Sequence, residues 1–208
     1  MGANGADRSS HLIMPAYFDF TVSLQGVLPR PWRRFLLPAT ARFATLHSAI
    51  QDACGWSESH LYLFRAAGDL DHEAIAGLIL ADDDLSEPMA DASTTPLTRY
   101  FGAGERTTCL YVYDFGDNWV HDVQLNDVVT LPERFTRRLL GGEHLFPPDD
   151  SGGAFGYVAI QEALRTGKDP EGLLDWARGV WGWTGEFDLE AVRKRFEPRP
   201  RKQPRRDS

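Results

Sequence analysis

Two stretches of alternating hydrophobic and polar positions predict a β-hairpin near the middle of the chain. Residues 108–113 and 119–125 both repeat with period two, which is the spacing of half-buried strands. The residues between them include Gly, Asp and Asn, which tight turns favour. This hairpin also gathers unusual chemistry, in the side chains of Asp114, Asp117, Trp119 and His121. We expect the fold to be organised around it.

The same alternation predicts three further strands, at 17–24, 32–38 and 60–64. Apolar residues at helical spacing predict a helix over 43–54, with Thr40 as its N-cap and Gly55 as its stop. Further helices are expected over 96–101, 132–140, 155–165 and 173–180, and after a cap at Asp188. The mixture indicates an α+β protein, in which helices pack on an antiparallel sheet.

A chain of 208 residues suits a single domain. We expect the folded domain to span residues 15–196, with disordered tails at 1–14 and 197–208. Gly, Ala and acidic residues dominate 65–106. That composition predicts a variable insertion or connector with little core of its own.

The charge is unevenly distributed along the chain. The whole chain carries a net charge of −8, whereas residues 193–208 hold eight basic and two acidic residues, a net of +6. The remainder therefore carries −14. An acidic body repels a phosphate backbone, so nucleic-acid binding is not expected of the body and is open only to the basic tail.

The sequence also bears on the compartment. It holds no apolar run of the 18 or so residues that a membrane-spanning helix needs, and it lacks the apolar core of a signal peptide at its start. Cys54 and Cys109 are too few and too far apart for a disulfide scaffold. We expect both thiols to be reduced and the protein to be cytoplasmic.

Several blocks, taken in order, resemble the plasmid-pRiA-type Orf-three-like family of bacterial proteins, some of which are passengers of insertion elements. The blocks are Pro31 to Phe35, Leu46-His47, Gly55-Trp56, His60-Leu61-Tyr62, Tyr113 to Asp117 with Trp119 and His121, Pro147 to Asp150, and Gly152-Gly153 with Gly156-Tyr157. The resemblance implies a compact α+β domain and a bacterial setting, but no particular reaction. Phe146 stands where the family commonly has Cys, so a metal or redox role that depended on that cysteine would not carry over.

The segment His60-Leu61-Tyr62-Leu63-Phe64 resembles the short peptide that bacterial replication proteins insert into the sliding clamp. Leu61, Leu63 and Phe64 match its pattern, and His60 replaces the usual Gln. A Leu and a Phe in such a peptide act as anchors in apolar pockets. The alternative is that the segment is a core strand, which the hydrophobic pattern alone favours.

A second hypothesis is a divalent-metal or hydrolytic site. Its ligands would be the oxygens and imidazole of Asp114, Asp117, His121, Asp149 and Asp150. Their spacing matches no defined metal motif, and turn and cap chemistry accounts for every acid without a ligand. The sequence therefore assigns no metal or other cofactor.

Next to Trp32, the adjacent Arg33 and Arg34 could together clamp an anion. Pairing of the two arginines with nearby acids is the favoured alternative.

Together these features favour action through a protein partner over catalysis. The sliding clamp, bound through residues 60–64, is the suspected partner, with interference in replication as the consequence. The alternatives are a metal-dependent hydrolase that uses the acidic hairpin and the Pro-Pro-Asp-Asp loop, and a structural or accessory protein of a mobile element.

Overall fold

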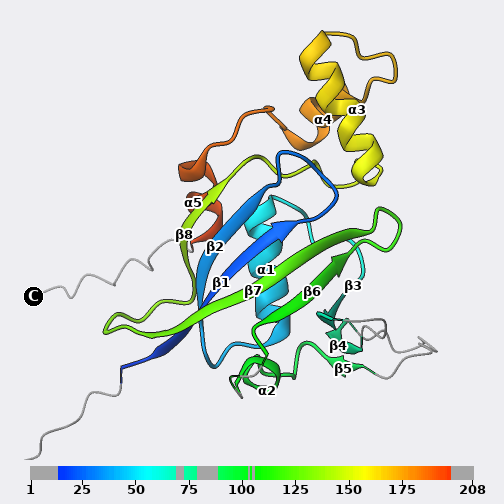
Figure 1. The fold of residues 1–208 in the computed structure, drawn as a ribbon. Coiled ribbons are helices and arrows are strands. Elements are labelled where there is room, and N and C mark those ends of the chain that lie inside the picture. The colour runs from blue at the N-terminus through cyan, green and yellow to red at the C-terminus, as the bar shows by residue number, and fades with distance from the viewer. Residues whose placement is uncertain (1–13, 69–72, 79–88, 103, 105, 198–208) are drawn as a thin grey trace, which may run out of the picture.

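The structure is a computed structural model, and it describes residues 14–68, 73–78, 89–102, 104 and 106–197. These residues form one sheet of eight strands in the order β5-β4-β3-β6-β7-β1-β2-β8, together with five helices (Figure 1). The strands are β1 (Ala16–Leu24), β2 (Trp32–Pro38), β3 (Tyr62–Ala66), β4 (Ala74–Gly77), β5 (Ala90–Asp91), β6 (Thr108–Tyr113), β7 (Trp119–Thr130) and β8 (Arg138–Glu143). The helices are α1 (Phe43–Cys54), α2 (Thr98–Phe101), α3 (Gly153–Thr166), α4 (Leu173–Trp181) and α5 (Leu189–Phe196).

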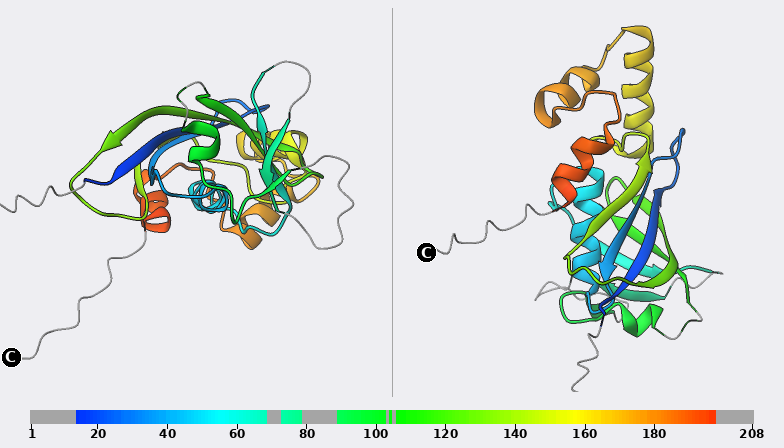
Figure 2. Two further views of the ribbon diagram at one scale, coloured as in Figure 1. Left: turned by 90° about the horizontal axis from the view of Figure 1, so that it is seen from below. Right: turned by 90° about the vertical axis from the view of Figure 1, so that its left-hand side faces the viewer.

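The core lies between α1 and the sheet, which curves around this helix (Figure 2). The apolar stripe of α1 is fully buried and faces the aromatic side chains of the strands. Phe20, Phe35, Phe64 and Tyr111, each 0% exposed, come from four different strands. The helix ends at Gly55, which adopts the left-handed conformation at φ +88° as predicted.

The central hairpin is confirmed. Strands β6 and β7 pair antiparallel from Thr108↔Gln124 to Tyr113↔Trp119. Their alternate side chains enter the core, as the period-two pattern predicts. The α+β class is confirmed as well, with one refinement: β4 and β5 pair in parallel, so the sheet is mixed rather than wholly antiparallel.

Two local predictions are wrong. The predicted helix over 132–140 does not form, because its last three residues begin strand β8, which pairs with β2 through Phe35↔Leu139. There the tertiary pairing overrides helix propensity. Thr40 does not cap α1 either: the N-cap position is Arg42, which makes no side-chain capping bond.

Residues 65–106 differ from the expected connector. Their described parts contain β4, β5 and α2, and they contribute Ala76, Ala92, Leu97 and Phe101 to the core, each at most 2% exposed. The described part of this segment therefore extends the sheet beyond β3. The predicted helix over 96–101 corresponds to the shorter α2.

Helices α3 and α4 lie beyond one end of the sheet, whereas α5 lies against α1 and β8 (Figures 1 and 2). Asp188 caps α5 as predicted, since its side chain accepts hydrogen bonds from the backbone N–H groups of Glu190 and Ala191. The expected tails at 1–14 and 197–208 fall almost wholly outside the described residues. None of the described helices has both the length and the apolar character needed to cross a bilayer.

Candidate functional site

The segment from His60 to Phe64 leads into β3, an interior strand between β4 and β6. Phe64 is 0% exposed, and its ring centroid lies 4.9 Å from that of Tyr111 and 5.0 Å from that of Phe43. Leu61 and Leu63 are partly buried. The segment is thus a core strand, and the phenylalanine that a clamp-binding peptide would offer as an anchor is not available at the surface.

Arg33 and Arg34 do not converge on one anion. Successive residues of β2 point to opposite faces of the sheet. Arg34 pairs with the buried carboxylate of Asp19, at 2.7 Å between Nη2 and Oδ2, whereas Arg33 is buried on the core side. The pairing with an acid, expected as the alternative, therefore holds for Arg34 only.

Two members of the predicted acid–histidine set are held elsewhere. His121 is 0% exposed, and its ring lies 5.3–6.0 Å from those of Trp56, Tyr111 and Phe146. Burial lowers its pKa to about 4, so it is a neutral core residue. Asp117 uses Oδ2 to accept the backbone N–H of Gly152 at 3.0 Å, which ties the hairpin turn to the start of α3.

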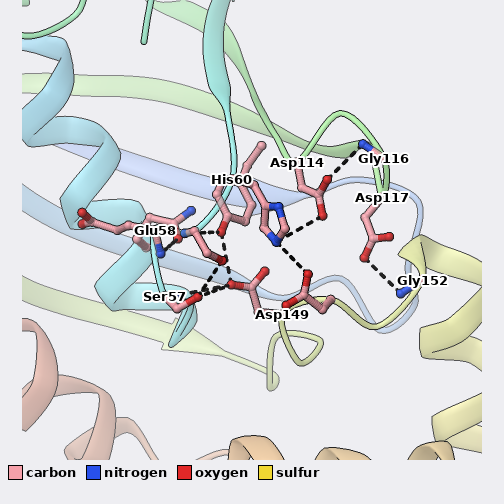
Figure 3. Close-up of polar contacts among 12 residues, drawn as sticks. Ser57, Glu58, His60, Asp114, Gly116, Asp117, Asp149 and Gly152 are labelled. Carbon is pink, nitrogen blue, oxygen red and sulfur yellow. Dashed lines mark hydrogen bonds and ion pairs between the residues drawn. The ribbon is translucent and has the colours of Figure 1, made fainter. Parts of the chain in front are cut away.

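The remaining three acids lie beside a histidine, His60, that is outside the predicted ligand set. His60 lies before β3, Asp114 directly after β6, and Asp149 and Asp150 in the loop between β8 and α3. The backbone N–H of Asp114 donates to the carbonyl of Leu61, so the ends of β3 and β6 hold the first two side by side. The side chain of His60 lies between the hairpin turn and the Asp149 loop (Figure 3). We call His60, Asp114, Asp149 and Asp150 the carboxylate–imidazole cluster.

Asp149 is the anchor of this cluster and is 0% exposed. Its Oδ2 atom accepts three hydrogen bonds, from the backbone N–H and the hydroxyl of Ser57 and from the hydroxyl of Tyr113, at 2.9–3.2 Å. Its Oδ1 atom is buried and has no hydrogen-bond donor among the described residues. In Figure 3 this second oxygen lies on the side that faces His60. A buried carboxylate oxygen without a partner is costly, and it marks a place where a ligand would be stabilising.

His60 contacts two acids at once. Its Nε2 atom lies 2.6 Å from Oδ1 of Asp150 and 3.7 Å from Oδ2 of Asp114. Partial burial opposes the imidazolium, but the hydrogen bond to Asp150 and the charges of Asp114, Asp150 and Asp149 outweigh it and raise the pKa of His60. The surrounding negative charges therefore favour the imidazolium form of His60.

Backbone strain collects at the same place. Asp114 and Asp150 have φ of +54° and +57°, and Glu58, two residues before His60, has +57°. Side chains other than glycine adopt this left-handed region at an energetic cost, and such residues are concentrated at functional sites. Each of the three is next to the cluster or within it.

The geometry of the cluster suits a cation. One ligand atom each from His60, Asp149 and Asp150 can be chosen so that all three lie within 4.8 Å of one another. Ligands about 2.1 Å from a metal ion are roughly 3–4 Å apart, so a small side-chain movement would close the set. Three protein ligands leave coordination positions for water or substrate.

Comparisons with known proteins identify the family. A model of the plasmid pRiA4b ORF-3-like protein family matches residues 16–195. The chain belongs to this family. It is similar to the uncharacterized protein y4hQ of Sinorhizobium fredii, with 33% identity over 171 residues that cover 82% of this chain and 83% of the relative.

The fold is also similar to a crystal structure of MM3350, a protein of unknown function from Methanosarcina mazei Go1. The TM-score is 0.73 at 28% identity, over 86% of this chain and 97% of the other. The resemblance found in the sequence blocks is thereby confirmed. These relatives carry no stated activity, so the chemistry of the family has to be argued from the residues themselves.

The sequence pattern groups His60 with Leu61, Leu63 and Phe64 as a peptide, whereas in the structure His60 lies beside the acids. The useful signal was in the hairpin prediction and the strand at 60–64: pairing that strand with β6 would have brought His60 beside Asp114.

Proposed function

We propose that this protein binds a divalent transition-metal ion through His60, Asp149 and Asp150 and acts as a metal-dependent hydrolase. The observation that carries the proposal is the fully buried carboxylate of Asp149, one oxygen of which is held by three donors while the other has none among the described residues. A cation would supply the missing partner and would also take the place of the proton on His60.

The ligand chemistry favours Mn²⁺ or Zn²⁺ over Mg²⁺ and Ca²⁺. Imidazole nitrogen together with carboxylate oxygens suits first-row transition metals, whereas Mg²⁺ and Ca²⁺ prefer oxygen ligands alone. The three hydrogen bonds to Oδ2 would hold the carboxylate of Asp149 in orientation, as hydrogen bonds to ligand side chains do at other metal sites. Asp150, which is exposed, and His60, which is partly exposed, would complete the ligand set from the solvent side.

Hydrolysis is the reaction that such a site supports best. A bound ion would lower the pKa of a water molecule and polarise the substrate. Asp114 lies beside His60, has its Oδ1 fixed by the backbone N–H of Gly116 at 2.9 Å, and keeps Oδ2 directed to the cluster. We assign it the role of accepting the proton of that water.

Action through the sliding clamp is the weaker candidate. Its anchor Phe64 is a core residue, so insertion of residues 60–64 into a partner would require β3 to leave the sheet. No contact on the surface of the described residues specifically favours it.

The proposal is tested by calorimetric titration of the chelator-treated full chain with Mn²⁺ and Zn²⁺. Native protein is expected to bind one ion per chain, and Asp149→Asn to weaken binding at least about tenfold. Asp122→Asn removes the same charge from β7, away from the cluster, and is the matched control. Absence of binding, or equal affinity in both variants, would refute the site. Hydrolysis of bis(p-nitrophenyl) phosphate that depends on the ion and is lost in Asp114→Asn then tests the reaction.

A further inference from the structure

A cavity of about 280 Å³ is lined in part by residues 145–148, which belong to the loop that also carries Asp149. Its walls come from the end of α1, the loop 145–148, the last residue of α4 with the segment that follows it, and α5 itself. The side chains that matter here are Arg33, Cys54, Phe146, Trp181, Trp183 and Arg195. This cavity is separate from the carboxylate–imidazole cluster and does not depend on it.

Arg33 is a buried charge without a counterion in the described part of the chain. It is 1% exposed, and no carboxylate of the described residues lies within ion-pair distance. Nε donates to the carbonyl of Ala53 at 3.3 Å, and Nη1 donates to those of Trp32 and Glu143 at 2.7 and 2.9 Å. Nη2 has no acceptor among the described residues. Burial lowers the pKa of Arg33 to about 10, so the guanidinium remains charged at neutral pH.

The groups around Arg33 leave its charge unbalanced. The rings of Phe146 and Phe187 lie 4.8 and 4.4 Å from its Cζ atom and offer only cation–π attraction. The Cys54 thiol is no counterion, because its burial raises its pKa and keeps it neutral. The charge of Arg195 adds to the lowering of the Arg33 pKa, so the two cations repel each other.

Two more donors line the same cavity. Arg195 projects from α5 and donates Nε to the carbonyl of Asp52 at 2.7 Å, and it forms no ion pair with a described residue. The indole N–H of Trp181 is buried and has no acceptor in the described part of the chain. Around this one cavity, two guanidinium groups and an indole N–H thus have no anionic partner among the described residues.

We propose that this cavity binds a small organic monocarboxylate with a flat apolar body. Arg33 and Arg195 would pair with the carboxylate, for which the planar guanidinium is suited, and Trp181 would donate to it. Phe146 and Trp183 would contact the apolar part. The cavity is at the small end of ligand pockets, which limits the body to about the size of one ring.

The acids of the lining set the charge of the ligand. Glu186 and Asp188 also face this region, and the carboxylate of Asp188 is engaged by the N-terminus of α5. Two acids against two guanidinium groups disfavour a dianion such as phosphate, and leave a single negative charge as the best match for the buried Arg33.

The test titrates the full chain with benzoate and follows tryptophan fluorescence, since Trp181 and Trp183 line the cavity. Benzamide, which has the same shape without the charge, and inorganic phosphate are titrated in parallel. Benzoate is expected to bind at least about tenfold more tightly than either. Equal binding of benzamide would overturn the ion pairing, and tighter binding of phosphate would overturn the assignment of a monocarboxylate.

Three variants locate the site. Arg195→Gln is expected to weaken benzoate binding at least about tenfold, because it removes an exposed member of the charged pair. Lys194→Gln removes the neighbouring exposed cation, which does not line the cavity, and is expected to leave the affinity unchanged. Glu186→Gln is expected to strengthen binding. Equal losses in Arg195→Gln and Lys194→Gln, or no saturable benzoate binding by the native chain, would overturn the proposal.

Discussion

Nε2 of His60 lies 2.6 Å from Oδ1 of Asp150, although the two residues are 90 positions apart in the sequence. This contact joins the start of β3 to the loop before α3, and the buried carboxylate of Asp149 stands beside it. A histidine between carboxylates, beside a buried carboxylate oxygen that has no donor among the described residues, is the arrangement on which the proposed cation site rests.

Phe64→Ala is expected to lower the free energy of unfolding by about 3–5 kcal/mol, because it leaves a cavity among the rings of Phe43 and Tyr111. Leu63→Ala changes the preceding residue of β3, which is only partly buried, and is expected to lower the free energy of unfolding by clearly less. Urea denaturation measures both. Small and equal losses would show that the segment is a surface peptide rather than a core strand.

Tyr113→Phe is expected to reduce stability by about 1–2 kcal/mol and metal affinity by about tenfold. The hydroxyl of Tyr113 donates to Asp149 at 3.1 Å and accepts the backbone N–H of Ser59 at 3.2 Å, whereas its ring stays packed on Trp56. Tyr100→Phe is the control, because it also removes a tyrosine hydroxyl that donates a hydrogen bond, here to the carbonyl of Thr108, but far from the cluster. If both variants bound metal as the native chain does, Tyr113 would have no part in positioning Asp149.

Stability is expected to fall as the pH drops from about 6.5 toward 3. Burial lowers the pKa of His47 to about 3 and that of His121 to about 4, while both titrate near 6.5 in the unfolded chain. Between these values the unfolded state binds protons that the folded state does not, so each histidine lowers the free energy of unfolding by about 1.4 kcal/mol for each unit by which the pH falls. His47→Gln is expected to flatten this slope in chemical denaturation between pH 4 and 7. An unchanged slope would show that folding does not shift the pKa of His47.

Gly153→Ala is expected to destabilise the protein and to loosen the Asp149 loop. Gly153 has φ +67°, and an added Cβ would lie 2.8 Å from the carbonyl oxygen of Asp117. Gly179→Ala in α4 meets open space, and in a helix interior it is expected to stabilise by about 0.5–1 kcal/mol. Thermal melts compare the two. If Gly153→Ala left the melting temperature unchanged, the close approach of Gly153 to the carbonyl of Asp117 would not be what holds the Asp149 loop in place.

The elements with a clear hydrophobic period were predictable from the sequence. The hairpin of β6 and β7, strand β1 and helices α1, α4 and α5 all follow from alternation or helical spacing together with turn and cap residues. The segment 132–140 was not, because Leu139 and Leu140 fit a helix as well as a strand until β2 provides a partner. Leu164 stands at helical spacing from Tyr157 and Ile160 in α3, yet it is 40% exposed, and Ala163 takes the core position instead.

The candidate site was only partly predictable. Their chemistry alone marks Asp114, Asp149 and Asp150 as candidate ligands. The sequence favours His121 as the imidazole, because His121 is close to Asp114 along the chain. Strand alternation places His121 on the core face with Trp119, whereas the pairing of β3 with β6 brings His60 to the acids. Likewise Arg34 was grouped with Arg33 through adjacency, although neighbouring residues of a strand face opposite ways.

The most direct test of the metal site is the anomalous diffraction of crystals grown with Mn²⁺, recorded above the manganese absorption edge. If the site binds the ion, one peak per chain is expected about 2.0–2.3 Å from Nε2 of His60 and from carboxylate oxygens of Asp149 and Asp150, and this peak disappears in Asp149→Asn. No peak in the cluster at millimolar Mn²⁺, or a peak that persists in Asp149→Asn, would contradict it.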